Sequence, residues 1–525
     1  MLLSSVFKFG GAALADGPGI RRAVEIVRAH LEREGSGLDA GLDAGTGASD
    51  MTAKPPGGPG ESPPPAENRL LVVVSAHAGV TDLLETVAQA AAEGHLEADR
   101  VRIRHRTLLS QLGLDPELLD RHLRELYQIL GRIQETGRVA PEERDYVLSF
   151  GERMSARIVA RTLTEAGIPA TPVDAWDLGL VTDSRHGEAR PLEGLETAIR
   201  QALATVPGVP VVTGFLAKDE AGNLTTLGRN GSDLTASILA AAMGAGEIQY
   251  WKTVGGILTA DPRLVPEARV IERLSYSEAA EFALHGAEVL HPGAVEPALR
   301  AQMRVRVRSV LTPDEPGTLL EPDGEARAST GGRAPGVSGR APVGRGPVGL
   351  ATRSGLVRLV LDSGGTQDGG QRRALLAELF AALERHGVDP AAAQVSAAEL
   401  GIVVAPNTHE IATTLAGGSG SATANLAASG PRGLAGVLED FGGRAHLERD
   451  LALVALVGRD EGSGPRQFQA SLEALAAENI PVEQAVFAAG ALSQKFVVAE
   501  KDRAPAARAL HAHWFQTHKT EPVQT

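Results

Sequence analysis

A lysine and two glycines stand together near the start of the chain, in the run Val6-Phe7-Lys8-Phe9-Gly10-Gly11. Glycine lets a backbone approach a ligand closely, and a lysine beside a helix N-terminus adds a full charge to the amide dipoles. The run therefore indicates a phosphate site. It matches neither the P-loop nor the dinucleotide pattern, so a glycine turn with a solvated lysine is an equal alternative.

Two hydroxyl residues follow the buried strand predicted at 70–74. Ser75 stands at the end of that strand, and Thr81 opens the next helix after small residues that let the backbone approach a ligand. Both hydroxyls could contact a ligand, although Thr81 is also a natural helix cap. We expect His77 to be a loop histidine rather than a base.

A carboxylate lies inside a strongly apolar stretch. Glu152 follows Gly151 within the helix predicted over 147–165. Because a buried carboxylate is costly without a partner, Glu152 would suit a substrate ammonium group. The alternative is a surface residue paired with Arg153 or Arg157.

The most informative run is TTLGRNGSDLT at 225–235, which follows a strand ending at Phe215. Arg229 can hold a carboxylate through two parallel hydrogen bonds. Ser232 and Asp233 stand at a helix N-terminus, where amides attract anions. A simple cap would explain either residue, but would not need the glycine and arginine in front.

A second glycine turn follows the strand predicted at 248–254, in the run WKTVGGILTADPR of residues 251–263. Its glycines would let a nucleotide lie over the backbone, and Lys252 and Arg263 could face phosphate. An ordinary turn ending in Asp-Pro is the plainer alternative.

The elements that must position these residues alternate between strand and helix. Strands predicted at 3–9, 70–74, 209–215 and 248–254 are separated by helical periodicity. This alternation implies a largely parallel α/β sheet covered on both faces. Ligands bind such sheets at the carboxyl ends of the strands, so the residues just after each strand carry most information. Two short β-α-β-β units near the C-terminus suggest a duplicated module.

Composition narrows the class of protein. Fifty-one basic and 65 acidic residues give a net charge of −14, which argues against general nucleic-acid binding. Cysteine is absent, which fits a reducing cytosol, and no run approaches the ~20 apolar residues of a membrane span. We expect a soluble, cytoplasmic, multi-domain protein with no membrane or nucleic-acid partner. Residues 35–68 are expected to be disordered, and 406–446 have too few apolar residues for a continuous core element.

With the run GAEVLHP at 286–292, in which His291 is expected to be structural, these motifs resemble the aspartokinase (aspartate kinase) family in order and spacing. The resemblance covers nearly the whole chain apart from the 35–68 insert. It implies an amino-acid-kinase three-layer αβα sandwich, a flexible linker and two ferredoxin-like (βαββαβ) ACT domains. Their expected ranges are 1–320, 321–348, 349–448 and 449–525, with the C-terminal helix a candidate to complete the first ACT unit.

The resemblance implies an activity: ATP-dependent phosphorylation of the L-aspartate side chain to 4-phospho-L-aspartate, with Mg²⁺, as the first step toward lysine, threonine and methionine. Lys8 would stabilise the transferring phosphoryl group and Asp233 would orient Lys8, and no residue is assigned to a metal. The residues implied to hold aspartate are Thr81, Glu152, Phe215, Arg229 and Ser232. Those implied to border ATP are Lys8, Gly10, Gly11, Ser75, Thr253, Val254, Leu258 and Arg263.

Several positions depart from the family pattern. The usual KFGGTS ends in Ala12 and Ala13, the usual Trp-Thr-Asp reads Trp-Lys-Thr with Lys252, the usual tyrosine of the next turn is Leu258, and the usual Gly-Ala-Lys-Val has Glu288.

Residues 388–396 lack most of the polar groups that hold an effector amino acid in the family. Inhibition by lysine or threonine is therefore not expected, while another amino-acid effector at the ACT units is left open. A dimer or larger assembly is expected, because ACT units pair edge to edge.

Two rival functions remain. One is another kinase of this fold, acting on glutamate, acetylglutamate, carbamate or UMP, which Ala12 and Ala13 keep open. The other is a catalytically weakened, amino-acid-binding regulatory paralogue, which Lys252 and Leu258 favour.

Overall fold

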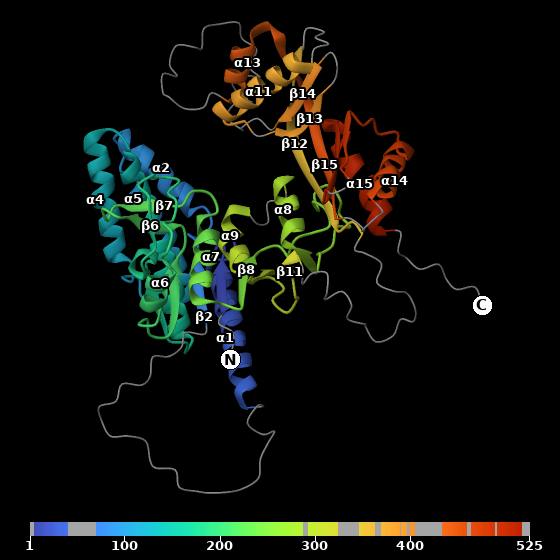
Figure 1. The fold of residues 1–525 in the computed structure, drawn as a ribbon. Coiled ribbons are helices and arrows are strands. Elements are labelled where there is room, and N and C mark those ends of the chain that lie inside the picture. Colours follow the sequence, from blue (N-terminus) through green and yellow to red (C-terminus); the bar gives the residue numbers. More distant parts are fainter. Residues whose placement is uncertain are drawn as a thin grey trace, which may run out of the picture. The chain divides into compact units, whose positions relative to one another are not determined.

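The computed structural model describes residues 5–39, 70–286, 292–323, 346–362, 369–388, 390–395, 399–404, 433–458, 464–488 and 491–516. They fall into two compact units (Figure 1). The first takes in the described residues of Met1–Ile257, Val270–Tyr276 and Val289–Thr330. The second takes in those of Leu258–Arg269, Ser277–Glu288 and Gly331–Thr525. The second unit thus includes two short segments of the range expected for the catalytic domain.

An eight-stranded sheet runs through the first unit in the order β3-β5-β2-β1-β8-β10-β11-β9. Every neighbouring pair is parallel except β10 and β11, which confirms the α/β class. The strands β1, β2 and β5 are buried along their whole length, as strands covered on both faces should be, and β2 is apolar throughout. The bounds are β1 Ser5–Phe9, β2 Leu70–Val74, β3 Ala170–Val173, β5 Val209–Thr213, β8 Glu247–Lys252, β9 Arg273–Ser275, β10 Arg304–Ser309 and β11 Thr318–Glu321.

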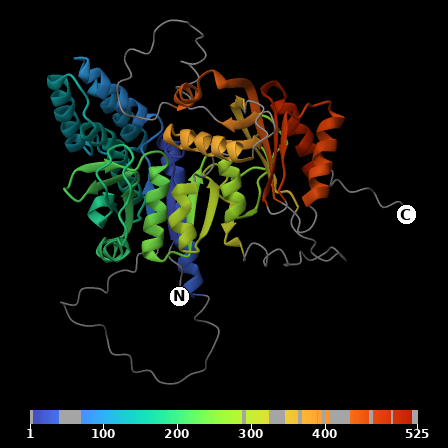
Figure 2. The same ribbon diagram turned by 45° about the horizontal axis from the view of Figure 1, so that its top comes forward.

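Eight helices of the first unit are described with this sheet, and α8, which begins at the last residue of a first-unit segment, belongs almost wholly to the second unit. The bounds are α1 Gly17–Asp39, α2 Val80–Ala92, α3 Ala98–Leu112, α4 Asp120–Thr136, α5 Pro141–Glu165, α6 Glu196–Leu203, α7 Gly231–Met243, α8 Tyr276–Leu284 and α9 Pro292–Arg300. Helices α7 and α9 lie side by side (Figure 2). A separate three-stranded sheet contains β4 Val181–Thr182, β6 Leu216–Asp219 and β7 Leu224–Thr226.

Local chemistry sets the helix starts that matter for the site. Asp16 Oδ1 accepts the Gly19 amide at 2.8 Å, which caps the start of α1. Helix α5 begins with Pro141, and the Glu143 carboxylate accepts the Ala140 amide at 3.1 Å.

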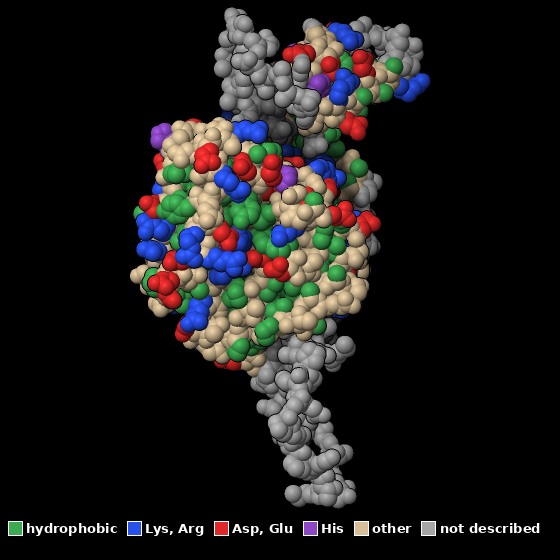
Figure 3. Space-filling model, turned by 90° about the vertical axis from the view of Figure 1, so that its left-hand side faces the viewer, with side chains coloured by type: hydrophobic (Ala, Val, Ile, Leu, Met, Phe, Trp, Pro, Cys, Tyr) green, Lys and Arg blue, Asp and Glu red, His purple; other side chains and the backbone are tan. Residues whose placement is uncertain are grey.

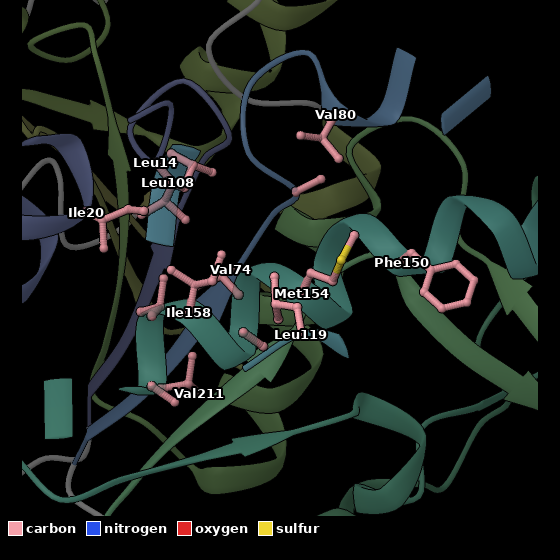
Figure 4. Packing of buried hydrophobic residues seen from close by; sticks show 14 of the residues in the cluster. Leu14, Ile20, Val74, Val80, Leu108, Leu119, Phe150, Met154, Ile158 and Val211 are labelled. Atoms are coloured by element: carbon pink, nitrogen blue, oxygen red, sulfur yellow. The ribbon is translucent and has the colours of Figure 1, made fainter. Parts of the chain in front are cut away.

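The main hydrophobic cluster fixes α5 against the sheet. Met154 and Ile158 of α5 lie beside Val74 of β2 and Val211 of β5 (Figure 4). Burying a side chain of this size stabilises a fold by roughly 1.5–3 kcal/mol. Because these contacts begin two residues after Glu152 in the same helix, they also help to fix its position.

Charged side chains of both signs are interspersed on the face of the first unit in Figure 3. Pairs within one helix include Arg102 with Asp99 on α3 and Arg121 with Glu125 on α4. Exposed pairs of this kind contribute only about 0.2–1 kcal/mol each, so packing rather than ion pairing holds α3 and α4.

Two expectations, disorder at 35–68 and no continuous core element at 406–446, need correction. Helix α1 continues to Asp39, so residues 35–39 are helical, while 40–68 lie outside the described residues. In the 406–446 stretch, residues Gly433–Phe441 form α13, because Leu434, Val437 and Phe441 bury one helical face. Residues 406–432 lie outside the described part of the chain.

The second unit is built on a six-stranded antiparallel sheet with the order β13-β14-β12-β15-β17-β16. Its first lobe follows the expected βαββαβ order from β12 to β15. The bounds are β12 Gly349–Asp362, α11 Gly369–Arg385, β13 Pro390–Val395, β14 Glu399–Val404, β15 Ala445–Val457, α14 Gly464–Ala477, β16 Gln484–Val486, β17 Ser493–Ala499 and α15 Arg503–His511.

The two long strands of this sheet serve both lobes. Residues 356–361 of β12 pair with 400–404 or 445–451 in the first lobe, whereas 349–353 pair with 453–457 in the second. A boundary at 448/449 therefore falls inside β15. The C-terminal helix α15 buries Ala506, Ala507 and Leu510 in the second lobe, so it does not complete the first lobe. The N-terminal end of β12 is the shared piece instead.

The linker expected at 321–348 is shorter at both ends. Glu321 belongs to β11, and Val348 donates its amide to Val457 O at 2.8 Å. Residues 324–345, and the run at 287–291, lie outside the described residues. None of the helices in the described part of the chain is both long and apolar enough to cross a bilayer.

Candidate active site

The loops after four central strands meet at the carboxyl edge of the large sheet. The Gly10 amide donates to Trp251 O at 3.2 Å, and the Ser75 amide donates to Phe9 O at 3.2 Å. A Cβ on Gly11 would lie 2.6 Å from Ala76 O. Only glycine permits this approach of the loops after β1 and β2, which explains the glycine in the first turn.

A pocket of about 380 Å³ opens among these loops. It brings together most of the residues that the sequence indicated for the aspartate and phosphate sites. Those lining it are Lys8, Gly11, Ser75, Thr81, Glu152, Phe215, Ser232 and Asp233, with Ala76, His77, Ala78, Gly79, Asp82, Gly228, Asn230 and Gly231.

One buried carboxylate in this site contacts two lysines. Lys8 Nζ of β1 lies 2.5 Å from Asp233 Oδ1, and Lys252 Nζ of β8 lies 3.4 Å from Asp233 Oδ2. Burial raises the pKa of Asp233, but the two ammonium groups outweigh burial and hold that pKa below its ordinary value. Asp233 is therefore ionised and ties the end of β1 to the end of β8 through the first turn of α7.

Glu152 is buried, and only one of its two carboxylate oxygens accepts a hydrogen bond from the described residues. Its Oε1 accepts the Ala76 amide at 3.0 Å, and its Oε2 has no hydrogen-bond partner among the described residues. Burial raises the pKa of Glu152 to about 7. The alternative of surface pairing is wrong, because Arg153 pairs with Glu125 at 2.8 Å and Arg157 with Asp174 at 2.5 Å.

Two residues of the pocket lining have a left-handed backbone conformation. Phe215 has φ 68° and Asn230 has φ 59°, a conformation that costs a non-glycine residue free energy and clusters at functional sites. The Phe215 amide donates to Thr235 Oγ1 at 3.0 Å, and a Cβ on Gly231 would lie 2.8 Å from the Phe215 ring. The loop after β5 is thus pressed against the start of α7.

Other predicted residues lie away from the pocket lining. Arg229 is exposed, although its neighbours Gly228 and Asn230 line the pocket. Thr253 and Val254 are exposed just after β8.

The remaining predicted nucleotide residues divide between the units. Gly10 is next to Lys8, with its Cβ position 3.7 Å from Lys8 Nζ. Leu258 and Arg263 belong to the second unit, where Arg263 Nη2 pairs with Asp261 Oδ2 at 2.8 Å.

Sequence reasoning missed Asp145. This buried carboxylate accepts Thr226 Oγ1 at 2.7 Å, the Gly187 amide at 3.0 Å and His186 Nδ1 at 3.0 Å. It lies seven residues before Glu152 on α5, hence on the same helical face. The seven-residue spacing of two acidic residues on one face of an apolar helix was the sequence feature that could have identified Asp145 as a candidate site residue.

His77 is buried in the loop after β2. Its Nδ1 lies 2.8 Å from Leu14 O, and burial lowers its pKa to about 3. The ring is therefore neutral at neutral pH and fixes the loop after β2.

Comparison with known proteins agrees with this geometry. The model of the amino acid kinase family matches residues 5–309. Aspartokinase 1, chloroplastic, of Arabidopsis thaliana is 40% identical over 41% of this chain and 39% of its own length. Aspartokinase 2, chloroplastic, of the same plant is 36% identical over 48% of this chain and 49% of its own length. The chain thus spans about half or less of these curated relatives.

Longer matches exist at lower identity. The lysine-sensitive aspartokinase 3 of Escherichia coli is 28% identical over 97% of this chain and 99% of its own length. The crystal structure of E. coli aspartokinase III in complex with aspartate and ADP superposes with a TM-score of 0.69 at 26% identity, over 98% of this chain and 100% of that one. The Clostridium acetobutylicum aspartate kinase shares the fold, with a TM-score of 0.68 at 19% identity and coverage of 98% and 100%. Since the family model matches more than half of the chain, the protein belongs to the amino acid kinase family.

Proposed function

We propose that the protein is an aspartate kinase that transfers the γ-phosphoryl group of ATP to the side-chain carboxylate of L-aspartate. The observation that carries the proposal is one pocket holding both the Lys8–Asp233 ion pair and the unpartnered Oε2 of Glu152. The aspartokinases that match along the whole chain, one of them with aspartate and ADP bound, support the choice of substrates.

The reaction needs charge stabilisation rather than a base. An aspartate oxygen forms a bond to the γ-phosphorus, the bond to the bridging oxygen breaks, and ADP leaves with the electron pair while no proton moves. Two unit charges ~4 Å apart repel by roughly 4 kcal/mol at an effective dielectric of ~20. Lys8 and the positive end of α7 offset this repulsion and the charge of the transition state.

Aspartate would be held at three points. Glu152 takes the ammonium group, since its spare oxygen faces no other donor among the described residues. Ser232 and Thr81 supply hydroxyls, and Phe215 forms a wall of the pocket. The exposed Arg229 would turn onto the α-carboxylate from the rim.

The nucleotide would lie along the two glycine turns. Within the first unit it would border Gly10, Gly11, Ser75, Thr253 and Val254. No group of three or more His, Asp or Glu side chains among the described residues could hold a metal ion. Mg²⁺ would therefore arrive on the phosphate oxygens of ATP, as this ion commonly does.

We also propose an assembly of two or more chains through the second unit. The strands β13 and β16 are the edges of its sheet, and edge strands favour pairing with another chain. Light scattering of the purified protein tests this, and a monomer at micromolar concentration would contradict it. An effector amino acid at this unit is tested by repeating the activity assay with lysine, threonine or methionine.

The substrate is tested by trapping the acyl phosphate with hydroxylamine. We expect hydroxamate formation with L-aspartate and Mg-ATP, and none when either is omitted. Hydroxamate formation with glutamate or acetylglutamate, but not with aspartate, would show that the protein acts on that other substrate instead. Binding of aspartate without turnover under any condition would favour a regulatory paralogue.

A further inference from the structure

Lys252 is the last residue of β8, the strand that pairs with the Lys8 strand β1. Lys8 of β1 is opposite Tyr250 of the parallel strand β8. Side chains two residues apart on a strand share a face, so Lys252 lies on the same face as Lys8 and one step nearer the carboxyl edge. Thr253 and the second glycine turn follow at once.

The two lysines approach the same carboxylate from different sides. Lys8 Nζ contacts Asp233 Oδ1, and Lys252 Nζ contacts Asp233 Oδ2. The Lys252 side chain is 22% exposed against 7% for Lys8. Lys8 lines the pocket that contains Glu152, whereas Lys252 does not. Asp233 thus separates a lysine on the amino-acid side from a lysine on the side of the second glycine turn.

Placing Lys252 beside Asp233 in addition to Lys8 costs free energy. A single lysine would neutralise Asp233 without the repulsion between two ammonium groups. Burial lowers the pKa of Lys252, Asp233 opposes that shift, and the nearby charge of Lys8 adds to it. Asp233 is already paired by Lys8 at the shorter distance. A lysine kept in this place is suited to a polyanion, because charge-assisted contacts to phosphate are about twice as strong as neutral hydrogen bonds.

We propose that Lys252 is a second phosphate-binding cation of the active site, which contacts the nucleotide phosphates while Lys8 serves the transferring group. The proposal rests on the proposed kinase function. Asp233 then sets the spacing of the two ammonium groups. Lys252 belongs to the nucleotide side only, so its loss should affect nucleotide and leave aspartate binding almost unchanged.

The test is calorimetric titration of ADP with Mg²⁺ into the full chain. For Lys252→Met we expect the Kd of ADP to rise by about ten- to hundredfold, kcat to fall, and the KM of aspartate to stay within about twofold. Lys252→Arg keeps the charge and should recover most of the ADP affinity. Lys501→Met, which removes the same charge from an exposed site in the second unit, should bind ADP as the unmodified chain does.

Two results would overturn the proposal. One is an unchanged ADP affinity in folded Lys252→Met, with a raised aspartate KM or a lower melting temperature, which would leave Lys252 a positioning role at Asp233. The other is a failure of inorganic tripolyphosphate to compete with ADP in the unmodified chain. If Lys252→Met does not fold, Lys252→Gln gives the same comparison. Because ADP titration needs no turnover, it stands even if the hydroxamate assay detects no aspartate phosphorylation.

Discussion

Lys8 and Asp233 are nearly inaccessible to water, with side-chain exposures of 7% and 4%. Removing one partner of a buried pair normally strands the other charge at a cost of about 3–5 kcal/mol. Here Lys252 remains beside Asp233 at 3.4 Å, so the fold should tolerate the loss of Lys8 better than the chemistry does.

Lys8→Ala is therefore expected to lower kcat by at least about 10²–10³-fold while the far-UV circular dichroism spectrum stays unchanged. The rate of hydroxamate formation measures the first effect. Turnover near that of the unmodified chain would remove Lys8 from the reaction.

Glu152 makes substrate binding depend on pH. Its pKa of about 7 in the fold lies above the ordinary 4.5 because of burial. An ammonium group requires the ionised form, so the KM of aspartate should fall as pH rises from 6 to 8. Glu152→Gln should raise this KM and flatten its pH profile. A KM of the unmodified chain that does not change over this range would contradict the assignment.

The same residue affects stability with a defined sign. The folded state keeps the Glu152 proton to higher pH than the unfolded state does. This contribution to the unfolding free energy is complete below about pH 4.5 and is lost as pH rises through about 7. Urea titrations at pH 5 and pH 8 should show the unmodified chain losing more stability than Glu152→Gln, and equal losses would count against a raised pKa.

At the scale of elements, α5 carries two acidic side chains for two tasks. Glu152 faces the pocket, and Asp145 anchors Thr226 of β7 and the loop at Gly187. A hydrogen-bond hub of this kind positions the run before α7 without touching substrate.

Asp145→Asn should raise the KM of aspartate about tenfold, because an amide NH₂ would face donors that now reach a carboxylate. ADP affinity should not change. Glu142→Gln, at an exposed position of the same helix, is the matched control. An unaltered KM in folded Asp145→Asn would show that the hub serves stability alone.

The first glycine turn provides another contrast between elements. Gly11→Ala would place its Cβ 2.6 Å from Ala76 O, whereas a Cβ on Gly131 in α4 meets nothing within 4 Å. We expect Gly11→Ala to lose at least tenfold in kcat/KM and Gly131→Ala to gain roughly 0.5–1 kcal/mol of stability. Similar effects of the two substitutions on activity would contradict the role of the close approach.

The sequence predicted the strands β1, β2, β5 and β8 and the runs that follow them, because apolar residues cluster in each of these strands. Glu152 could be selected as a candidate site residue because a carboxylate buried in an apolar helix is costly without a partner. Asp145 could not be assigned its role, since its partners Gly187 and Thr226 are 42 and 81 residues away. Arg229 was selected for its ability to hold a carboxylate and by resemblance, but its exposure depends on loop geometry that periodicity does not encode.

At the scale of the whole molecule, the pocket belongs to the first unit, and the antiparallel sheet belongs to the second. Ligands stabilise the unit that binds them. Differential scanning calorimetry should show two transitions, and saturating ADP should raise the midpoint of one of them more than the other. A single transition shifted as a whole would show that the two units unfold together.

Within the second unit, β12 and β15 are each one unbroken strand through both lobes, with register shifts between Arg353 and Arg358 and a left-handed Gly355 at φ 67°. A one-residue insertion elsewhere in either strand would turn every inward side chain outward in the lobe beyond it. The neighbourhood of Gly355 already absorbs such an offset. Insertions and deletions should therefore be tolerated there and not elsewhere along these two strands. The two lobes share both strands, so an insertion elsewhere in one lobe would require a compensating change of length before the other lobe.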